Sequence, residues 1–360
     1  MMTMSYFVFM MICLLQMISS IIIVDFLNAY FCVLGVTSMR CSTAVFFGEE
    51  LAKYGFGGSH PMGSDRIYAF WSKFQSESLD KSDKIIIEKP VLADEKVILS
   101  FHENDYVDLV KKASKHGRGF FLDTGDTPIF NGAFEASCYV VGSTLKALDL
   151  VVRKENGIDH AFNPIGGLHH SRRSSAAGFC IFNDIGIAIL EARKKYGIKR
   201  IAYIDIDAHH GDGVYYEFED DPFMFFADIH EDGHFLYPGT GSELETGLGN
   251  AEGTKLNIPL APGSADNDFI GNFKKIEKFI DDIAKPELII LQCGADSLIG
   301  DPITHLKFTA AAHRYAADSL HRLAHKHCNG RMIALGGGGY NSTNIAEAWT
   351  SVVKSFVERS

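Results

Sequence analysis

Ile201-Ala-Tyr-Ile-Asp-Ile-Asp-Ala-His-His-Gly-Asp-Gly-Val214 is the stretch of the chain that decides its fold. It begins as an apolar, β-branched run typical of a buried strand, and then changes to acids, histidines and glycines. Because side chains alternate along a strand, Asp205, Asp207 and His209 can point to the same side. Open α/β sheets bind ligands at the carboxyl ends of their strands, so the stretch predicts a site there. An acidic surface loop is the alternative, but three aspartates and two histidines within eight residues favour a site.

The composition is that of an ordinary globular protein with an acidic balance. The chain has 360 residues, of which 46% are hydrophobic and 22% are charged, and its formal net charge is −11. This length can form one large α/β domain or two smaller ones, and the negative charge argues against nucleic-acid binding. Dispersed cysteines without a CxxC pair predict free thiols in a reducing compartment, here the cytoplasm. The cysteines are Cys13, Cys32, Cys41, Cys138, Cys180, Cys293 and Cys328.

Residues 1–38 form an apolar N-terminal extension with a single charged residue. The uncharged run from Tyr6 to Val24 has the length of a membrane-spanning helix, which takes roughly 20 residues. A secretory signal is disfavoured because no basic residue precedes the run, and Arg40 as the first positive charge would keep the rest of an anchored chain cytoplasmic. We favour a third alternative, in which Met39 is the true start, because a strand already begins at about Thr43.

From residue 43 onward, short apolar strands alternate with amphipathic helices. This alternation predicts a single domain over residues 41–358, with a parallel sheet covered by helices on both faces. Besides the central stretch, strands are expected at 43–47, 160–164, 223–229, 255–259, 287–293 and 331–335. Helices are expected from 64 or 65 to about 75, at 101–114, 131–152, 183–196, 267–283 and 309–327, and from about 342.

Four further segments place reactive residues in loops or at strand ends. They are Gly166-Gly-Leu-His-His-Ser171, Gly178-Phe-Cys180, Gly294-Ala-Asp-Ser-Leu-Ile-Gly-Asp-Pro302 and Gly336-Gly-Gly-Gly-Tyr340. In identity, order and spacing these segments resemble the zinc-dependent histone deacetylase superfamily, which includes acetoin-utilisation proteins and acetylpolyamine amidohydrolases. The resemblance covers roughly residues 41–358. It implies the arginase–deacetylase fold and hydrolysis of an acetyl group from the ε-amino group of lysine or from a small acetylated amine.

Asp207, His209 and Asp296 are the predicted metal ligands. One imidazole and two carboxylates leave coordination positions open, as catalytic zinc sites do. Asp296 by itself could equally be a helix N-cap, and the family pattern favours a ligand. The resemblance implies one catalytic Zn²⁺ and a nearby K⁺ or Na⁺ site that uses mostly backbone oxygens. The residues of that monovalent site would be Asp205, Asp207, His209, Ile229 and Asp228, which stands where serine is common.

The adjacent histidines His169 and His170 are the predicted proton-transfer groups, since imidazole titrates near neutrality. The resemblance pairs His169 with Asp205 and His170 with Asp212. It makes His170 the general base and leaves His169 a mainly electrostatic role. It also implies that Tyr340, which follows four glycines, polarises the substrate carbonyl. An incidental aromatic residue in a glycine-rich turn is the alternative for Tyr340.

The remaining candidates surround the expected substrate tunnel, and they are Arg66, Asp126, Gly178, Phe179, Tyr237 and Ile303. The resemblance makes Phe179 and Tyr237 the aromatic walls, with Tyr237 in place of the commoner phenylalanine. Gly178 would offer its backbone carbonyl to the substrate amide. Asp126 aligns with a rim aspartate that binds the substrate backbone, although it is equally typical of a turn. Arg66 aligns with the arginine of an internal acetate channel, with a surface charge as the alternative.

Two other classes of protein remain as alternatives. A ureohydrolase of the arginase–agmatinase kind shares the fold and the string Asp207-Ala-His209, but it bridges two manganese ions with further acidic ligands that the second half of the chain lacks. A non-catalytic acyl-lysine reader would be expected to lose a ligand or Tyr340, and both are present. Among deacetylases, the apolar rim residue Ile303 and the short loop at 55–63 favour acetyl-lysine peptides over acetylpolyamines.

Overall fold

The computed structural model describes residues 42–117 and 120–359. The predicted N-terminal extension, residues 1–38, lies outside these ranges. Within them, no helix combines the length and the apolar character needed to cross a membrane. Four cysteines fall in the described ranges, and all four are buried free thiols: Cys138, Cys180, Cys293 and Cys328.

Eight strands form one sheet in the order β2-β1-β3-β8-β7-β4-β5-β6, and every neighbouring pair is parallel. Parallel strands end at the same edge, so the loops after the central strands meet there. The edge strand β2 was not predicted, because its isoleucine run is short and only partly buried. The strands are β1 (Ser42–Phe46), β2 (Ile85–Glu88), β3 (Ile158–Asn163), β4 (Ile201–Asp205), β5 (Met224–Glu231), β6 (Lys255–Leu260), β7 (Leu288–Gln292) and β8 (Met332–Leu335).

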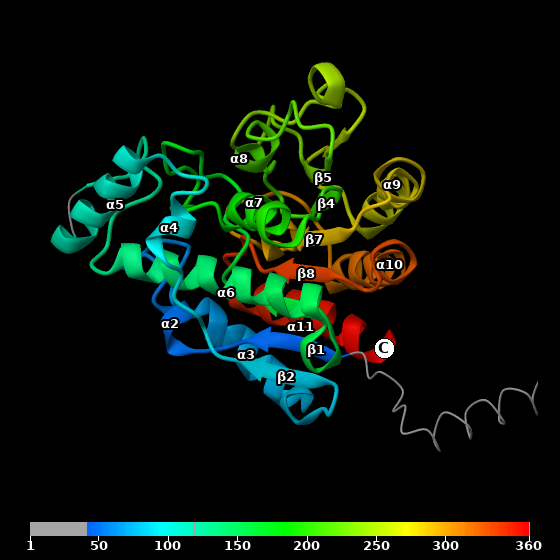
Figure 1. The fold of residues 1–360 in the computed structure, drawn as a ribbon, viewed down its shortest axis with the longest axis horizontal. Helices are drawn as coiled ribbons and strands as arrows, with labels where there is room; N and C mark the ends of the chain where they lie inside the picture. The colour runs from blue at the N-terminus through cyan, green and yellow to red at the C-terminus, as the bar shows by residue number, and fades with distance from the viewer. Residues whose placement is uncertain (1–41, 118–119, 360) are drawn as a thin grey trace, which may run out of the picture. The chain divides into compact units, whose positions relative to one another are not determined.

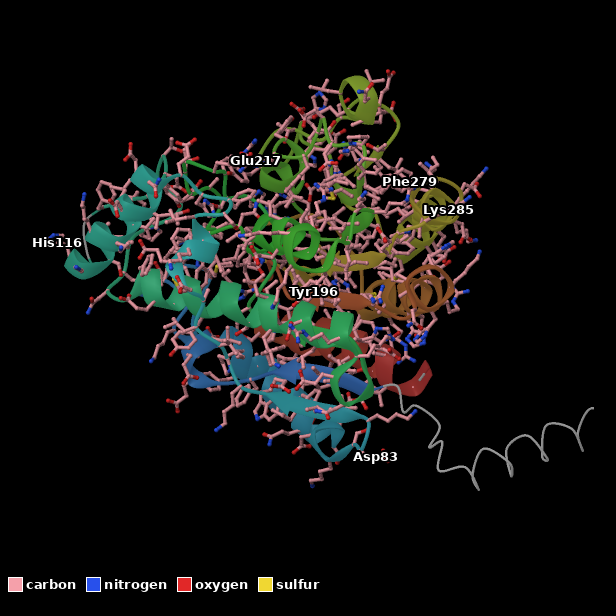
Figure 2. The ribbon with its side chains drawn as sticks, viewed as in Figure 1. Asp83, His116, Tyr196, Glu217, Phe279 and Lys285 are labelled. Carbon is pink, nitrogen blue, oxygen red and sulfur yellow. The ribbon has the colours of Figure 1, made fainter. Side chains whose placement is uncertain are left out.

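Helices cover both faces of the sheet, as the alternation of elements predicts (Figure 1). In β4, Ile201 and Tyr203 belong to the core beneath α6 (Ala133–Arg153) and α7 (Asp184–Tyr196). Ala202 and Ile204 belong to the core beneath α9 (Asp266–Phe279), α10 (Ala310–Cys328) and α11 (Ser342–Arg359). All four side chains are fully buried, which is why this strand reads as continuously apolar. Side chains fill the space between the sheet and its helices (Figure 2).

The helices begin and end close to the predicted positions. Asn183 and Thr309 cap their helices by accepting hydrogen bonds from the N–H groups of Gly186 and Ala311. The predicted helix at 267–283 ends as an α-helix at residue 279 and continues as a π-helical turn, η4 (Ile280–Ala284). The four-residue helices were not predicted, because they are too short to show periodicity. The α-helices are α2 (Glu49–Ala52), α3 (Arg66–Ser76), α4 (Glu95–Ile98), α5 (Asn104–His116), α6 (Ala133–Arg153), α7 (Asp184–Tyr196), α8 (Asp212–Tyr215), α9 (Asp266–Phe279), α10 (Ala310–Cys328) and α11 (Ser342–Arg359).

Candidate active site

A cavity of about 230 Å³ opens among the loops that follow the central strands. Every residue that lines it was predicted from the sequence except Leu236, which no pattern distinguishes from its neighbours. The loops at this edge of the sheet therefore bring together segments that lie far apart in the chain. The lining residues are Asp126, His170, Gly178, Phe179, His209, Leu236, Tyr237, Ile303 and Tyr340.

Asp207, His209 and Asp296 form a buried triad beside this cavity, and their ligand atoms all lie within 4.8 Å of one another. His209 Nδ1 lies 3.0 Å from Asp207 Oδ1 and 3.1 Å from Asp296 Oδ2. Asp296 is not a helix cap. It lies in the short turn η5 (Ala295–Ser297), and its Oδ1 accepts the N–H of Ala208 at 2.9 Å. Two carboxylates and one imidazole are a donor set that suits a divalent metal such as zinc.

Glycines allow the backbone to approach these carboxylates closely. A Cβ atom at Gly294 would lie 2.0 Å from Asp207 Oδ2, and one at Gly338 would lie 2.2 Å from Asp296 Oδ2. Asp207 Oδ2 also accepts hydrogen bonds from the Gly338 N–H at 2.9 Å and from Gln292 Nε2 at 2.8 Å. Gln292 was missed in the sequence, although its place as the last residue of a buried strand before Gly294 was a usable signal.

The pKa values of the three triad residues depend strongly on one another. Although burial opposes the charged imidazole, the hydrogen bonds that His209 donates to Asp207 and Asp296 raise its pKa to about 10. Burial and the neighbouring Asp207 raise the pKa of Asp296 to about 7. Burial also acts to raise the pKa of Asp207, but the charges of His169 and His209 hold it well below its ordinary value. The three groups therefore share a proton, which a cation bound by all three would displace.

Each of the two adjacent histidines is held by its own carboxylate. His169 Nδ1 lies 2.8 Å from Asp205 Oδ2, and His170 Nδ1 lies 2.6 Å from Asp212 Oδ1. These are the pairs that the family resemblance implies. Because each carboxylate accepts from Nδ1, the Nε2 atom of each ring is the one left for a substrate or a water molecule.

The two histidines differ in charge at neutral pH. Burial opposes the charge on His169, but the carboxylates of Asp205 and Asp207 raise its pKa to about 9. Burial and the charge of His169 lower the pKa of His170 to about 4, against the opposing effect of Asp212. His170 is therefore the ring that can accept a proton, and His169 is the ring that carries positive charge.

Tyr340 closes one side of the cavity. Its ring meets the ring of Phe179 edge to face, with centroids 5.6 Å apart. Its N–H donates to Asp301 Oδ2 at 2.9 Å, which anchors the loop after β8. Burial and the charges of Asp296 and Asp207 raise the pKa of the Tyr340 hydroxyl well above its ordinary value. The hydroxyl is therefore a hydrogen-bond donor throughout the neutral range.

The outer part of the cavity is more exposed. Tyr237 is 43% exposed, and its ring lies 5.1 Å from that of His170, centroid to centroid. Asp126 is exposed, in a loop organised by Asp123, whose Oδ1 accepts the Asp126 N–H at 2.8 Å. Phe179 is held from behind by the hydroxyl of Tyr54, which donates to its carbonyl at 2.8 Å. The aromatic walls are thus unequal, one fixed and one at the surface.

Arg66, Asp228 and Ile229 are predicted residues that lie outside both the cavity lining and the triad. Arg66 is buried and not a surface charge: its Nε donates to the carbonyl of Gly339 at 2.9 Å, and its guanidinium lies 5.2 Å from the centre of the Trp349 ring. It supports the glycine loop from beneath. Asp228 is buried beside Asp205 in the sheet register, and its carboxylate accepts the N–H of Gly211 at 2.8 Å. Its part in a monovalent-cation site stays a prediction, as does that of the buried Ile229, its neighbour in β5.

The fold and the cavity define an α/β protein with a candidate ligand site, including a triad of potential metal ligands, at the carboxyl edge of a parallel sheet. Residues 60–356 match the family model described as "Histone deacetylase domain". Over 322 residues, 87% of this chain and 81% of the relative, the chain is 38% identical to the acetoin utilization protein AcuC of Bacillus subtilis (strain 168). It is 35% identical over 312 residues to histone deacetylase B of Dictyostelium discoideum, covering 85% of this chain and 71% of that one.

A solved structure titled "Crystal Structure of HDA15 HD domain" superposes with a TM-score of 0.80 at 25% sequence identity, covering 89% of each chain. The chain belongs to the histone deacetylase family. Its eight-stranded parallel sheet is that of the arginase–deacetylase fold. Membership of this family makes the chain a deacetylase, a hydrolase in reaction class.

Proposed function

We propose that this deacetylase is zinc-dependent and removes the acetyl group from the ε-amino group of lysine in a peptide or protein, or from a related small acetylated amine. The observation that carries the proposal is the single cavity that joins two aromatic walls, Phe179 and Tyr237, to His170, His209 and Tyr340. The apolar stem of acetyl-lysine suits the aromatic walls, and its amide would then reach the polar end.

Asp207, His209 and Asp296 would hold one zinc ion, and the chemistry that zinc supplies when bound is Lewis-acid polarisation and a lowered pKa of water. His170, neutral and oriented by Asp212, accepts the proton of the attacking water and returns it to the leaving nitrogen. Water adds to the carbonyl carbon, the C–N bond breaks, and acetate and the protonated amine leave. Tyr340 donates a hydrogen bond to the carbonyl oxygen as negative charge develops there.

The proposal also covers the contacts at the outer part of the cavity and the compartment of the protein. Asp126 binds the substrate backbone, the Gly178 carbonyl accepts from the substrate amide, and Arg66 lies on the path by which acetate leaves. A K⁺ or Na⁺ ion near the triad belongs to the same proposal. The four described free thiols support a reducing compartment, and we propose the cytoplasm.

The test compares the wild type with an Asp207→Ala variant for zinc content and for hydrolysis of an acetyl-lysine peptide. We expect the variant to lose the zinc of this site and its activity together, because a ligand of the triad is gone. Asp220→Ala is the control, since Asp220 is exposed and lies outside the cavity. An Asp207→Ala variant that keeps both its zinc and its activity contradicts the proposal. So does a wild type that binds the acetylated peptide without turnover.

A further inference from the structure

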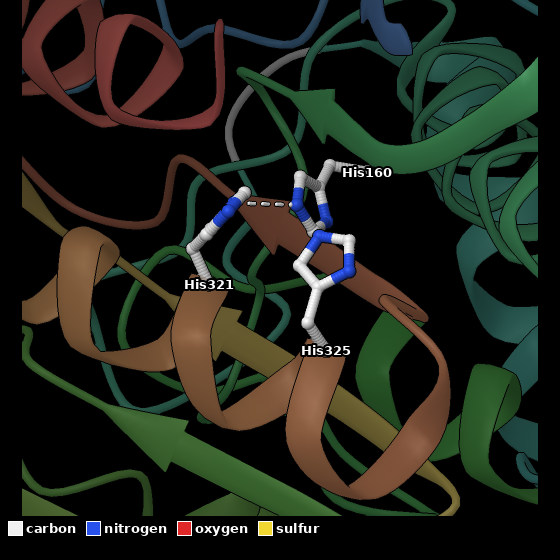
Figure 3. A group of neighbouring side chains, drawn as sticks. All are labelled: His160, His321 and His325. Atoms are coloured by element: carbon white, nitrogen blue, oxygen red, sulfur yellow. Dashed lines mark hydrogen bonds between the residues drawn. The ribbon is translucent and has the colours of Figure 1, made fainter. Parts of the chain in front are cut away.

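Three histidines gather at the opposite end of the sheet from the candidate active site. His160 is the third residue of β3, whereas the active-site loop begins only after Asn163. His321 and His325 lie one turn apart on α10, which packs on the face of the sheet that His160 shares with Phe162. Figure 3 shows the three rings converging, and one ligand nitrogen from each lies within 4.8 Å of the others.

The three imidazole rings contact one another, so their surroundings are not purely apolar. His160 Nε2 lies 2.9 Å from His321 Nδ1, so one ring donates and the other accepts. The ring centroids are 4.9 Å apart for His160 and His321, 5.4 Å for His160 and His325, and 4.6 Å for His321 and His325. A buried position of this size is ordinarily filled by an apolar side chain, since a buried polar group costs free energy unless it is paired.

His160 is not satisfied by its histidine neighbour alone. Its Nδ1 is buried and has no partner within hydrogen-bond distance among the described residues. The backbone of Gly330 lies near enough to favour a proton on the ring. Histidines that bind a metal through one nitrogen usually direct the other towards a backbone carbonyl or a carboxylate, and the Gly330 backbone is a candidate for that role once Nδ1 moves towards it.

The charges around the cluster keep the rings available as ligands. Burial and the neighbouring His321 and His325 lower the pKa of His160 well below its ordinary value. Burial and the charge of Lys154 lower the pKa of His325. Lys154 is itself paired with Asp159, which offsets its positive charge. The directions at His160 and His325 both favour neutral imidazole, which is the form that binds metals.

An acidic group also lies close to the exposed side of the cluster. A Cβ atom at Gly330 would lie 2.9 Å from His325 Cε1 and 3.1 Å from Asp159 Cγ, so this imidazole and this carboxylate flank the same point. His325 is exposed, whereas His160 and His321 are buried. An ion could therefore enter from solvent on the His325 side, and a water molecule could complete its coordination.

We propose that His160, His321 and His325 form a second metal site, for a divalent transition ion that prefers imidazole ligands, with Zn²⁺ as the ion of choice. Two histidines four residues apart on one helix face are a recurring chelating pair, and the third ligand comes from the strand beneath. Tetrahedral zinc with bonds of about 2.0–2.1 Å separates its ligand nitrogens by about 3.4 Å. His160 Nε2 and His321 Nδ1, which lie 2.9 Å apart, would therefore have to separate slightly, and the exposed His325 would adjust its position. The ion would tie α10 to β3 and act on stability, not on the reaction.

The test is the zinc content of the full chain after removal of metal and titration with zinc chloride alone. We expect about two equivalents for the wild type, about one for His325→Ala and about one for Asp207→Ala. The double variant Asp207→Ala/His325→Ala is expected to bind none. His116→Ala is the matched control, because His116 lies exposed at the end of α5 on the margin of the domain, and it should keep both equivalents (Figure 2).

A second measurement is the melting temperature of the Asp207→Ala variant with and without zinc. We expect zinc to raise it, and the added His325→Ala change to abolish the rise, since only an ion bound to the folded state stabilises it. The proposal is overturned if Asp207→Ala binds no zinc, or if His325→Ala binds as much as the wild type. If Asp207→Ala does not fold, the zinc contents of the wild type and His325→Ala decide alone. The count of two equivalents rests on the proposed function, but the cluster is scored by the equivalent that His325→Ala removes, and failure at the triad would instead appear as Asp207→Ala binding as much zinc as the wild type.

Discussion

The adjacent residues His169 and His170 differ in charge because their surroundings differ. His169 faces Asp205, and Asp205 lies beside Asp207 and Asp228 in a region rich in carboxylates. The carboxylate that pairs with His170 is that of Asp212, and Arg172 donates a hydrogen bond to the same carboxylate at 2.9 Å. A ring among several carboxylates holds a proton, and a ring beside a compensated carboxylate and a charged neighbour does not. The difference in charge thus follows from the neighbours and not from the residue type.

Tyr340→Phe tests the donor on the other side of the cavity. We expect kcat to fall by about 10²- to 10³-fold, the usual loss when one donor to a developing oxyanion is removed. Zinc content should not change, since Tyr340 is not among the triad ligands. The measurement is kcat on an acetyl-lysine peptide, with Tyr68→Phe as the control at an exposed tyrosine. A near-normal kcat would show that Tyr340 is an incidental aromatic residue of a glycine-rich turn and does not stabilise the oxyanion.

His102 gives a prediction on stability and pH. Its Nε2 accepts the N–H of Asn183 at 2.9 Å, and its Nδ1 lies 3.3 Å from the carbonyl of Arg173, so the neutral ring fits its surroundings. Burial lowers its pKa to about 4. The unfolded chain, with an ordinary pKa of about 6.5, therefore binds more protons between these values, and stability is lost as the pH falls from 6.5 towards 4.

For His102 alone this loss is about 2 kcal/mol between pH 7 and pH 5, from the linkage relation. His102→Gln keeps an acceptor for the Asn183 N–H but does not titrate in this range. We expect urea unfolding of the variant to show a pH dependence that is smaller than that of the wild type by about this amount. Equal slopes for the two proteins would mean that the folded protein tolerates a charged ring at this position.

At the scale of elements, the loops after β7 and β8 can approach the candidate metal ligands closely because they contain glycines where a side chain would collide. Gly338 donates its N–H to Asp207 and leaves the space that Asp296 occupies. Arg66 holds the same loop from below through the carbonyls of Gly337 and Gly339. The loop is thus fixed from two sides, and little freedom remains to absorb an added atom.

Gly338→Ala is expected to weaken zinc binding at the triad by about 10- to 100-fold, the usual effect of disturbing groups that orient metal ligands. The reason is the Cβ atom, which would lie 2.2 Å from Asp296 Oδ2 and 2.8 Å from Asp207 Oδ2. Competition for zinc between the protein and a chelator measures this loss of affinity. Gly271→Ala is the control: its Cβ meets nothing within 4 Å, and alanine within α9 should add about 0.5–1 kcal/mol of stability. Unchanged affinity in Gly338→Ala would show that the loop can shift.

At the scale of the whole molecule, the acidic charge and the rim of the cavity favour different substrates. A net charge of −11 attracts any polycation, including acetylated polyamines. The rim has the apolar Ile303 and the exposed Asp126, which favour a peptide backbone over a distant free ammonium group. Screening at physiological salt limits long-range attraction to about 8 Å, so the local contacts should decide.

We therefore expect kcat/KM to be higher for acetyl-lysine peptides than for N-acetylputrescine or N-acetylspermidine at physiological salt. The comparison should be repeated at low salt, where the weaker screening should narrow the difference. A clear preference for the acetylated polyamines at physiological salt would reverse this assignment, and it would identify the acidic surface as the feature that selects the substrate.

The sequence determined the order of strands and helices, the parallel sheet and the edge at which the site lies. Apolar strands that alternate with amphipathic helices specify this architecture through periodicity and burial, and those are local properties. The reactive strings around Asp207, His169 and Tyr340 were recognisable because several rare residue types stand together at strand ends. Short elements such as β2 and α8 carry no such periodicity, and they were therefore missed.

Only the tertiary structure decided which residues meet. Gln292 contacts Asp207, and Arg66 supports the loop after β8, through approaches that depend on the sheet order and on the helix packing, which local pattern does not encode. The cluster of His160, His321 and His325 has the same origin, since His160 in β3 lies 161 residues from His321 in α10. The local sequence determines on which face of a strand or helix a side chain lies, whereas the packing of the whole core determines which residues it contacts.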